Sequence, residues 1–297
     1  MSLKSIIQLL RPEQWAKNLF IFLPVFFHGE LWNVKMLIYS AISFVAFSFA
    51  ASSIYCFNDI FDVKTDREHP TKCKRPIAAG VISIPLAYII MVASLLVSTA
   101  IMLLFGNETR YAVLGIISLY YVLNIAYTLI LKKLPIIDVM IISIGFVLRI
   151  FVGGTTTGIE LSEWIIIMTF LLALLLAFAK RRDDVVIYET TGVVMRKNTN
   201  RYNLAFMNQI LSVISAVTII AYLMYTLSPD ITKQFNSQYV YITSFFVIAG
   251  IIRYLQITIV DLKSGNPTKN LYQDIFILCC VLGWIVSFAI IIYFVKF

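Results

Sequence analysis

Nine long apolar stretches follow one another along this chain of 297 residues, and no other feature of the sequence constrains the fold as strongly. Their approximate bounds are 15–28, 36–57, 81–105, 111–131, 135–153, 164–179, 204–227, 239–260 and 272–295. Most approach the ~20 residues that an α-helix needs to cross a bilayer, although the first and sixth are shorter and Pro24 interrupts the first. A membrane β-barrel would instead need short alternating segments. The sequence therefore predicts an all-α, polytopic membrane protein with about nine transmembrane helices.

Composition agrees with a chain embedded in lipid. Hydrophobic residues make up 60% of the sequence and charged residues 13%, whereas a soluble domain is roughly 45 to 50% apolar. No Pro-, Gly- or Ser-rich linker separates the apolar stretches, so residues 1–297 are expected to form a single integral membrane domain. The net charge of +8 could suggest nucleic acid, but the basic residues flank apolar stretches instead of forming a separate patch. We therefore expect the membrane bilayer as a partner and no nucleic acid.

The Lys and Arg residues are distributed unevenly between alternate loops. With the N-terminus in the cytoplasm, 18 of the 24 basic residues fall on the cytoplasmic side and four on the outer side, while Arg149 and Arg253 lie within predicted helices. Basic residues concentrate on the cytoplasmic side of membrane proteins. The asymmetry predicts a multi-pass protein of the inner (plasma) membrane with a cytoplasmic N-terminus. It also places the two most polar loops that we expect, 58–80 and 180–203, on the cytoplasmic side.

The first polar segment begins where the second apolar stretch ends. Asp59, Asp62 and Asp66 are spaced three and four residues apart, and Asn58 precedes them. If the helix continues past Phe57, the three carboxylates lie on one helical face, where like charges repel one another unless cations sit between them. Hard oxygen ligands at this spacing suit Mg²⁺ bridged to the phosphates of a substrate. We predict that these four residues bind Mg²⁺ and that the three aspartates, called the acidic cluster below, are catalytic.

Basic side chains follow the acidic cluster closely. They are Arg67, His69, Lys72, Lys74 and Arg75. Metal ions and cationic side chains together hold a diphosphate and neutralise the charge of a departing one. The alternative is a solvated acidic helix end that neighbouring cations balance. Because carboxylates and cations converge beside a membrane helix, we predict a substrate-binding site for phosphates that faces the cytoplasm and that also includes Asn58.

These residues carry a resemblance to a known family. The run Asn58-Asp59-x-x-Asp62-x-x-x-Asp66 resembles the first aspartate-rich motif of the UbiA superfamily of intramembrane prenyltransferases. The decaprenyl-phosphate phosphoribosyltransferase branch is resembled more closely, through Arg11-Pro12-x-Gln14-Trp15-x-Lys17-Asn18, Asp66-Arg67-x-His69-Pro70-x-Lys72-x-x-Arg75-Pro76-Ile77-Ala78-x-Gly80 and Lys180-Arg181-Arg182. The resemblance covers the whole chain. It implies a UbiA-like bundle of nine helices with a cavity that faces the cytoplasm and binds Mg²⁺ and a diphosphate.

The second polar segment distinguishes between branches of the superfamily. Members that act on aromatic substrates carry a second aspartate-rich motif with paired acids four residues apart, whereas this chain has Lys180, Arg181 and Arg182 followed by Asp183 and Asp184. Three cations suit a donor with an extra phosphate, such as the 5-phosphate of phosphoribosyl diphosphate. The alternative for each cation is a role as an anchor of the sixth helix at the membrane interface.

The resemblance also implies a reaction. A 5-phosphoribosyl group moves from phosphoribosyl diphosphate to the phosphate of a polyprenyl phosphate lipid, diphosphate leaves, and the product serves the synthesis of lipid-linked sugars for cell-envelope glycans. In this interpretation Gln14 and Lys17 help to position the acceptor. One alternative is a UbiA-type aromatic prenyltransferase that uses a polyprenyl diphosphate. Another is a membrane transporter, which should carry polar residues near the middle of several helices. A homo-oligomer remains open.

Two charged residues lie inside the fifth predicted helix. Asp138 and Arg149 are eleven residues apart, close to three helical turns, so they share a face. Charges at membrane depth are functional candidates, which places Asp138 at the mouth of a cavity and Arg149 deeper. An ion pair of Arg149 with another helix is the alternative.

Overall fold

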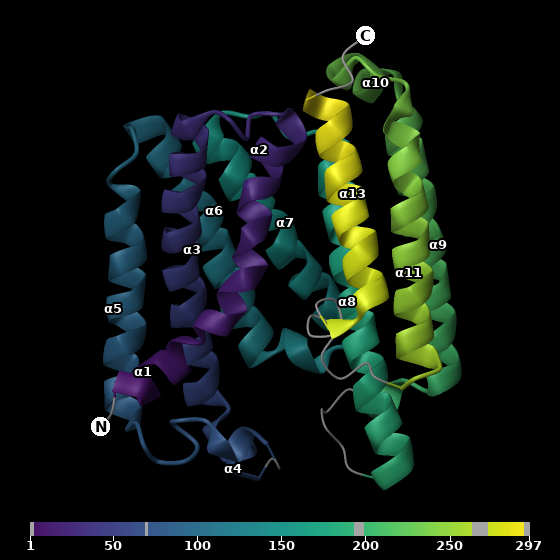
Figure 1. The fold of residues 1–297 in the computed structure, drawn as a ribbon. Coiled ribbons are helices and arrows are strands. Elements are labelled where there is room, and N and C mark those ends of the chain that lie inside the picture. The colour runs from purple at the N-terminus through teal and green to yellow at the C-terminus, as the bar shows by residue number, and fades with distance from the viewer. Residues whose placement is uncertain (1–2, 69–70, 193–198, 263–272, 294–297) are drawn as a thin grey trace. The chain divides into compact units, whose positions relative to one another are not determined.

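Helices dominate the computed structural model of this chain, which describes residues 3–68, 71–192, 199–262 and 273–293 (Figure 1). No strand occurs among these residues. Seven spans among them are long and apolar enough to cross a membrane, and the seventh joins a 3₁₀ turn to a helix. They are α3 (Val34–Phe61), α5 (Ile84–Met102), α6 (Asn107–Leu129), α7 (Ile137–Thr157), α8 (Glu163–Thr191), α9 (Leu204–Leu227) and η5 (Tyr239–Thr243) with α11 (Ser244–Ile259). The predicted all-α membrane class is confirmed.

The first and last apolar stretches form different elements. The first folds as a 3₁₀ helix, η1 (Pro12–Phe22), followed by α2 (Leu23–His28), which carries Pro24 in its first turn, where a missing N–H costs nothing. The last forms α13 (Ile275–Tyr293), an apolar helix that is not among the seven spans. The count of nine transmembrane helices therefore stays a prediction. The remaining elements are α1 (Leu3–Leu10), α4 (Val63–Glu68), η2 (Lys72–Lys74), η3 (Leu131–Lys133), η4 (Thr199–Arg201) and α10 (Pro229–Phe235).

Helix α8 is longer than the sequence predicted. The apolar stretch ends near Ala179, but the helix continues to Thr191, because the added turns still bury an apolar side chain, Val185. It ends where Gly192 adopts a left-handed conformation with φ 73°, which glycine adopts without strain. The expectation of a loop beginning at residue 180 was therefore wrong, and the basic residues there project from a helix.

The chain divides into two compact units, each described here by itself. Unit 1 comprises residues 1–131 and 145–161, and unit 2 comprises residues 132–144 and 162–297. The first part of α7 belongs to unit 2 and the remainder to unit 1. The expectation of a single domain over residues 1–297 stays a prediction.

In unit 1, α3 packs against α5, η1, α1 and α6 (Figure 1). Its buried positions include Ser43, Ala46 and Ala50, and such small side chains let membrane helices approach closely. The end of α7 also lies tightly against η1. A Cβ atom at Gly153 would overlap the backbone carbonyl of Ile21, so only glycine fits at this crossing.

In unit 2, α8 packs against α9, α9 against α11, and α11 against α13. The core between these helices contains Leu175, Phe178, Met207 and Leu211. The side chain of Asn203 caps α9 by accepting a 2.8 Å hydrogen bond from the N–H of Phe206. This packing holds the end of α8 that carries the predicted basic residues.

Candidate functional site

The acidic cluster lies in unit 1 at the junction of two helices. Asp59 is in the last turn of α3, Asp62 caps that helix, and Asp66 lies in α4. The helical hydrogen-bond spacing continues across the junction, since the N–H of Asp62 donates to Asn58 O at 2.9 Å and the N–H of Asp66 donates to Asp62 O at 2.8 Å. Asp59 and Asp66 are buried, while Asp62 is half-buried.

Arginine side chains hold the two buried carboxylates. Nη1 of Arg75 lies 3.0 Å from Asp59 Oδ1 and 2.6 Å from Asp66 Oδ2, so one guanidinium nitrogen joins both residues. Nη2 of Arg11 also donates to Asp59 Oδ1. The other oxygen of Asp59, Oδ2, is buried and has no hydrogen-bond partner. Asp59 therefore has one fully engaged oxygen and one available for a further ligand.

A divalent cation fits the chemistry of this cluster. In the described part of the chain, no three His, Cys, Asp or Glu side chains lie close enough together to hold a metal ion. Mg²⁺ commonly binds only one or two carboxylates and takes its other ligands from water and substrate phosphates. The unpartnered Oδ2 of Asp59 and the carboxylate of Asp66 are donors of that kind.

Sequence reasoning missed Arg11 as a site residue. Its backbone has a positive φ of 52°, which is uncommon for a residue other than glycine, and it begins η1 after the buried Leu9. Its guanidinium lies 5.4 Å from the centre of the Tyr55 ring, in cation–π range. The chain is tied here to α3 by Ser52, whose hydroxyl donates to Leu10 O at 2.7 Å. The signal was the position of Arg11 next to Pro12 in the first motif.

The other predicted residues of unit 1 differ in their exposure. Gln14 and Lys17 are half-buried in η1, and Lys72 is half-buried in η2. Lys74 is exposed in η2. Arg67 is exposed in α4.

Arg67 and Asn58 form hydrogen bonds with residues outside the acidic cluster. Nε of Arg67 donates to Ala78 O at 3.3 Å, so this arginine joins α4 to the chain that follows η2. His69 lies outside the described residues. Oδ1 of Asn58 accepts a hydrogen bond from the hydroxyl of Thr128 on α6.

The predicted basic residues of unit 2 differ from one another. Arg181 is buried, with Nε 2.5 Å from Asp138 Oδ2 and Nη1 3.4 Å from Asp184 Oδ2. Asp138 is also buried, and its Oδ1 has no hydrogen-bond partner. Lys180, one residue earlier on α8, is exposed. Asp138, which the sequence analysis treated as a functional candidate, therefore forms an ion pair with Arg181.

Arg182 is directed into unit 2. Its Nε lies 2.7 Å from Asn208 Oδ1, and Nη1 lies 2.7 Å from the carbonyl oxygen of Thr258. Nη2 lies 3.4 Å from the carbonyl oxygen of Ile259, the last residue of α11. Arg182 therefore caps the C-terminal end of α11, which favours a cation, and the alternative role of a structural anchor suits it better than phosphate binding.

Tyr202 adds a buried hydroxyl near the Arg181 pair. Its OH accepts a 2.6 Å hydrogen bond from the backbone N–H of Ile136. Burial raises the pKa of this phenol above its usual value, and the neighbouring Asp138 carboxylate acts in the same direction. The phenol therefore stays protonated near neutral pH.

Arg149 has no carboxylate partner in the part of the chain that the structure describes. Its Nε lies 2.7 Å from Asn18 Oδ1, and its Nη1 lies 2.6 Å from Gly145 O. Its guanidinium also lies over the rings of Phe47 and Tyr120, at 5.0 and 5.3 Å from their centres. This buried cation joins η1, α3, α6 and α7 within unit 1.

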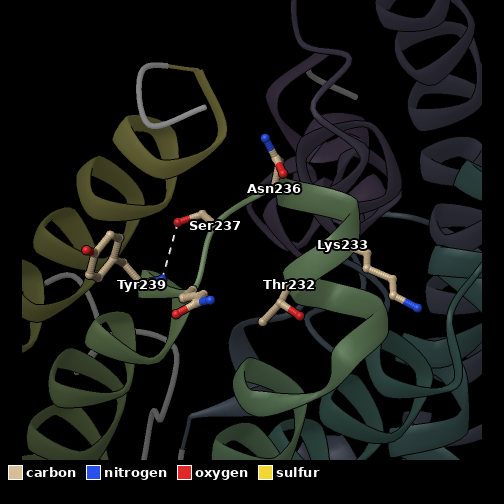
Figure 2. A pocket seen from close by; sticks show the side chains of 6 residues that line it. Thr232, Lys233, Asn236, Ser237 and Tyr239 are labelled. Carbon is tan, nitrogen blue, oxygen red and sulfur yellow. Dashed lines mark hydrogen bonds between the residues drawn. The ribbon is translucent and has the colours of Figure 1, made fainter. Parts of the chain in front are cut away.

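A cavity of about 360 Å³ lies in unit 2, and none of the residues that line it is a predicted site residue. Figure 2 shows that α10 and the segment after it form its walls, with Thr232 and Lys233 on the helix and Ser237 and Tyr239 on the following chain. The N–H of Tyr239 donates to the Ser237 hydroxyl at 3.2 Å. Among the residues that line the cavity, Lys233 carries a positive charge and none carries a carboxylate.

Residues 19–280 match the UbiA prenyltransferase family. The chain is 32% identical to the decaprenyl-phosphate phosphoribosyltransferase of Corynebacterium glutamicum, over 97% of this chain and 87% of that protein. It is 31% identical to the enzyme of the same name from Mycolicibacterium smegmatis, over 98% of this chain and 93% of that protein. In fold it is similar to a UbiA homologue from Archaeoglobus fulgidus bound to DMAPP and Mg²⁺, with a TM-score of 0.70, 21% identity, and coverage of 98% of this chain and 100% of that chain.

Proposed function

We propose that this chain, which belongs to the UbiA prenyltransferase family, transfers a 5-phosphoribosyl group from phosphoribosyl diphosphate to a polyprenyl phosphate. Its relatives along nearly the whole chain are decaprenyl-phosphate phosphoribosyltransferases, and this supports the choice of donor and acceptor. The observation that carries the proposal is the pair Asp59 and Asp66, held around one guanidinium nitrogen at the end of a membrane helix. That pair is suited to a metal ion bound with a diphosphate.

Mg²⁺ is the proposed metal ion. Asp59 and Asp66 would hold it, and Asp62, between them in sequence, would add negative charge that favours a cation. A bound divalent cation neutralises the negative charge that develops on a departing diphosphate. A UbiA homologue from Archaeoglobus fulgidus with a similar fold has been solved bound to DMAPP and Mg²⁺, which supports the choice of Mg²⁺.

Basic side chains have separate proposed roles. Arg75 and Arg11, which lie next to Asp59, bind phosphate oxygens of the donor. Arg67, His69, Lys72 and Lys74 supply further positive charge for the phosphates. Lys180 binds the 5-phosphate of the donor, and the buried Arg181 holds the end of α8 that presents it. Gln14 and Lys17 help to position the acceptor phosphate.

The bond changes follow from these roles. An oxygen of the polyprenyl phosphate attacks C1 of the ribose while the bond from C1 to the diphosphate oxygen breaks, and diphosphate leaves with its electron pair. The acceptor oxygen is already anionic at neutral pH, since the second pKa of a phosphate monoester is about 6. No side chain is therefore needed as a general base, and the work of the protein is to orient the reactants and neutralise charge.

The proposed location is the inner (plasma) membrane, with the N-terminus and the reacting groups at the cytoplasmic side. The chain is an integral membrane protein of a family that acts within membranes. The excess of Lys and Arg in one set of loops supports this orientation. A cytoplasmic site would give access to a water-soluble sugar diphosphate, while the isoprenoid tail stays in the lipid.

Purified protein tests the proposal directly. In Mg²⁺, phosphoribosyl diphosphate and a polyprenyl phosphate should yield a phosphoribosylated lipid and one diphosphate for each lipid formed. The same preparation should not prenylate an aromatic acid from a polyprenyl diphosphate. Prenylation of the aromatic acid with no turnover of phosphoribosyl diphosphate would favour the aromatic alternative, for which a second acidic pair is missing from the sequence.

A further inference from the structure

Asn58 and Thr128 join the last turns of two helices of unit 1. Asn58 lies one residue before Asp59 in α3, and Thr128 lies one residue before the end of α6. The hydroxyl of Thr128 donates to Oδ1 of Asn58. Thr128 is only 3% exposed, so water does not compete for this contact. The same hydroxyl also donates toward Asn124 O in the preceding turn, 2.9 Å away, so the two oxygens share its one proton and the rotation of the side chain is restricted.

This contact decides which end of the Asn58 amide is available. An amide side chain has an accepting oxygen at one end and a donating NH₂ group at the other. The oxygen of Asn58 is engaged by Thr128, and the structure gives its Nδ2 no hydrogen bond within the described residues. The residue is half-buried, so the NH₂ group is not sealed inside the protein. Asn58 therefore offers a donor beside the acidic cluster.

A donor at this place suits phosphate better than metal. Metal ions bind the oxygen of an asparagine, whereas phosphate oxygens accept hydrogen bonds from N–H groups. Asp59 and Asp66 already supply two carboxylates, and Mg²⁺ bound with a phosphate substrate needs no more than one or two.

We propose that Thr128 is a positioning residue that turns the Nδ2 group of Asn58 toward the diphosphate of the donor, so that Asn58 binds a phosphate oxygen and not the metal ion. The inference rests on the proposed function only in taking the acidic cluster to bind a metal ion with a diphosphate. Of the two roles that the sequence predicted for Asn58, metal ligand and substrate ligand, it keeps only the second, and it gives a function to Thr128, which no motif indicated.

Binding of inorganic diphosphate in the presence of Mn²⁺ tests this inference, measured by calorimetry on the purified full-length protein. Thr128→Val keeps the shape of the side chain and removes the hydroxyl, and it should weaken diphosphate binding about tenfold, which corresponds to one hydrogen bond to a charged group. Thr128→Ser should restore binding. Tyr121→Phe is the matched control, because it removes another hydroxyl between α6 and α3, the one that donates to Ser53. It should bind diphosphate as the wild type does.

Substitutions of Asn58 separate the two roles by the sign of their effect. If Nδ2 binds phosphate, Asn58→Asp should bind diphosphate more weakly than Asn58→Ala, because a carboxylate repels the ligand. If Oδ1 binds the metal ion, Asn58→Asp should bind more tightly than Asn58→Ala, since a carboxylate is a better ligand for a divalent cation. The second order would overturn the inference even if Thr128→Val did not fold. Equal binding by Thr128→Val and the wild type would also overturn it.

The choice of probe separates this test from the test of the reaction. Phosphoribosyl diphosphate and polyprenyl diphosphate both carry the diphosphate group, so a wrong assignment of the donor leaves the expected result unchanged. A wild-type protein that bound no diphosphate with Mn²⁺ would contradict both the metal site and the role of Asn58.

Discussion

Asp59 and Asp66 share one nitrogen, Nη1 of Arg75, which lies 3.0 Å from the first carboxylate and 2.6 Å from the second. The two aspartates come from α3 and α4, and both are buried. Two buried carboxylates repel one another strongly unless a cation lies between them. The two carboxylates therefore need positive charge beside them. A metal ion bound with a diphosphate would supply part of the positive charge that Arg75 supplies in this structure.

Removing one of these carboxylates should stop turnover. Asp66→Asn keeps the shape of the side chain but removes the charge that attracts a metal ion, so we expect a loss of roughly a hundredfold or more in kcat/KM for phosphoribosyl diphosphate. Initial rates with saturating Mg²⁺ measure this. Asp230→Asn, at an exposed residue of α10, is the matched control and should retain full activity. Wild-type rates for Asp66→Asn would contradict the metal–diphosphate site.

Arg181 and Lys180 are neighbours on α8, and we expect their substitution to affect stability very differently. Arg181→Met leaves Asp138 as a buried charge without its partner, and the loss of one member of a buried pair typically costs ~3–5 kcal/mol. Lys180→Met, at an exposed residue, should change the free energy of unfolding by no more than about 0.5 kcal/mol. Thermal unfolding in detergent measures both. Equal unfolding temperatures for the two variants would contradict a structural role for Arg181.

Lys180 should instead affect the donor. If its ammonium group binds the 5-phosphate, Lys180→Met should raise the KM for phosphoribosyl diphosphate about tenfold, as expected from the loss of one charge-assisted contact. The KM for the polyprenyl phosphate should change little. Ribose 1-diphosphate, which lacks the 5-phosphate, is the control donor, and the wild type and the variant should use it equally poorly. A wild-type KM for the full donor in Lys180→Met would remove Lys180 from the site.

The sequence predicted the helices well and their ends less well. Apolar stretches mark most of the membrane helices directly, because a helix in lipid must be apolar along its length. The end of α8 was missed because a polar helix can continue into water until a residue such as Gly192 stops it. The acidic cluster could be predicted because its members are close in sequence. Arg11 could not be assigned to Asp59, since 48 residues separate them and no local pattern reports such a contact. The same holds for Thr128 and Asn58, which are 70 residues apart.

Cysteine labelling in intact cells tests the orientation. Lys74→Cys, beside the acidic cluster, should react with a membrane-impermeant maleimide only after the membrane is permeabilised, because the excess of basic residues places it in the cytoplasm. Lys233→Cys, on α10, should react in intact cells and is the matched control. Both are made with Cys73 and Cys279, the cysteines that are not buried, changed to Ser. Reaction of Lys74→Cys from outside would reverse the orientation.

The fate of two labels in one donor tests the central claim most directly. Phosphoribosyl diphosphate carries ¹⁴C in the ribose and ³²P in the diphosphate, and it is incubated with the purified protein, Mg²⁺ and a polyprenyl phosphate before extraction into organic solvent. Transfer of the phosphoribosyl group breaks the bond between C1 and the diphosphate, so ¹⁴C should enter the lipid phase while ³²P stays in the water as diphosphate. Entry of ³²P into the lipid, or no ¹⁴C in the lipid above the level of the Asp66→Asn variant, would contradict the proposed reaction.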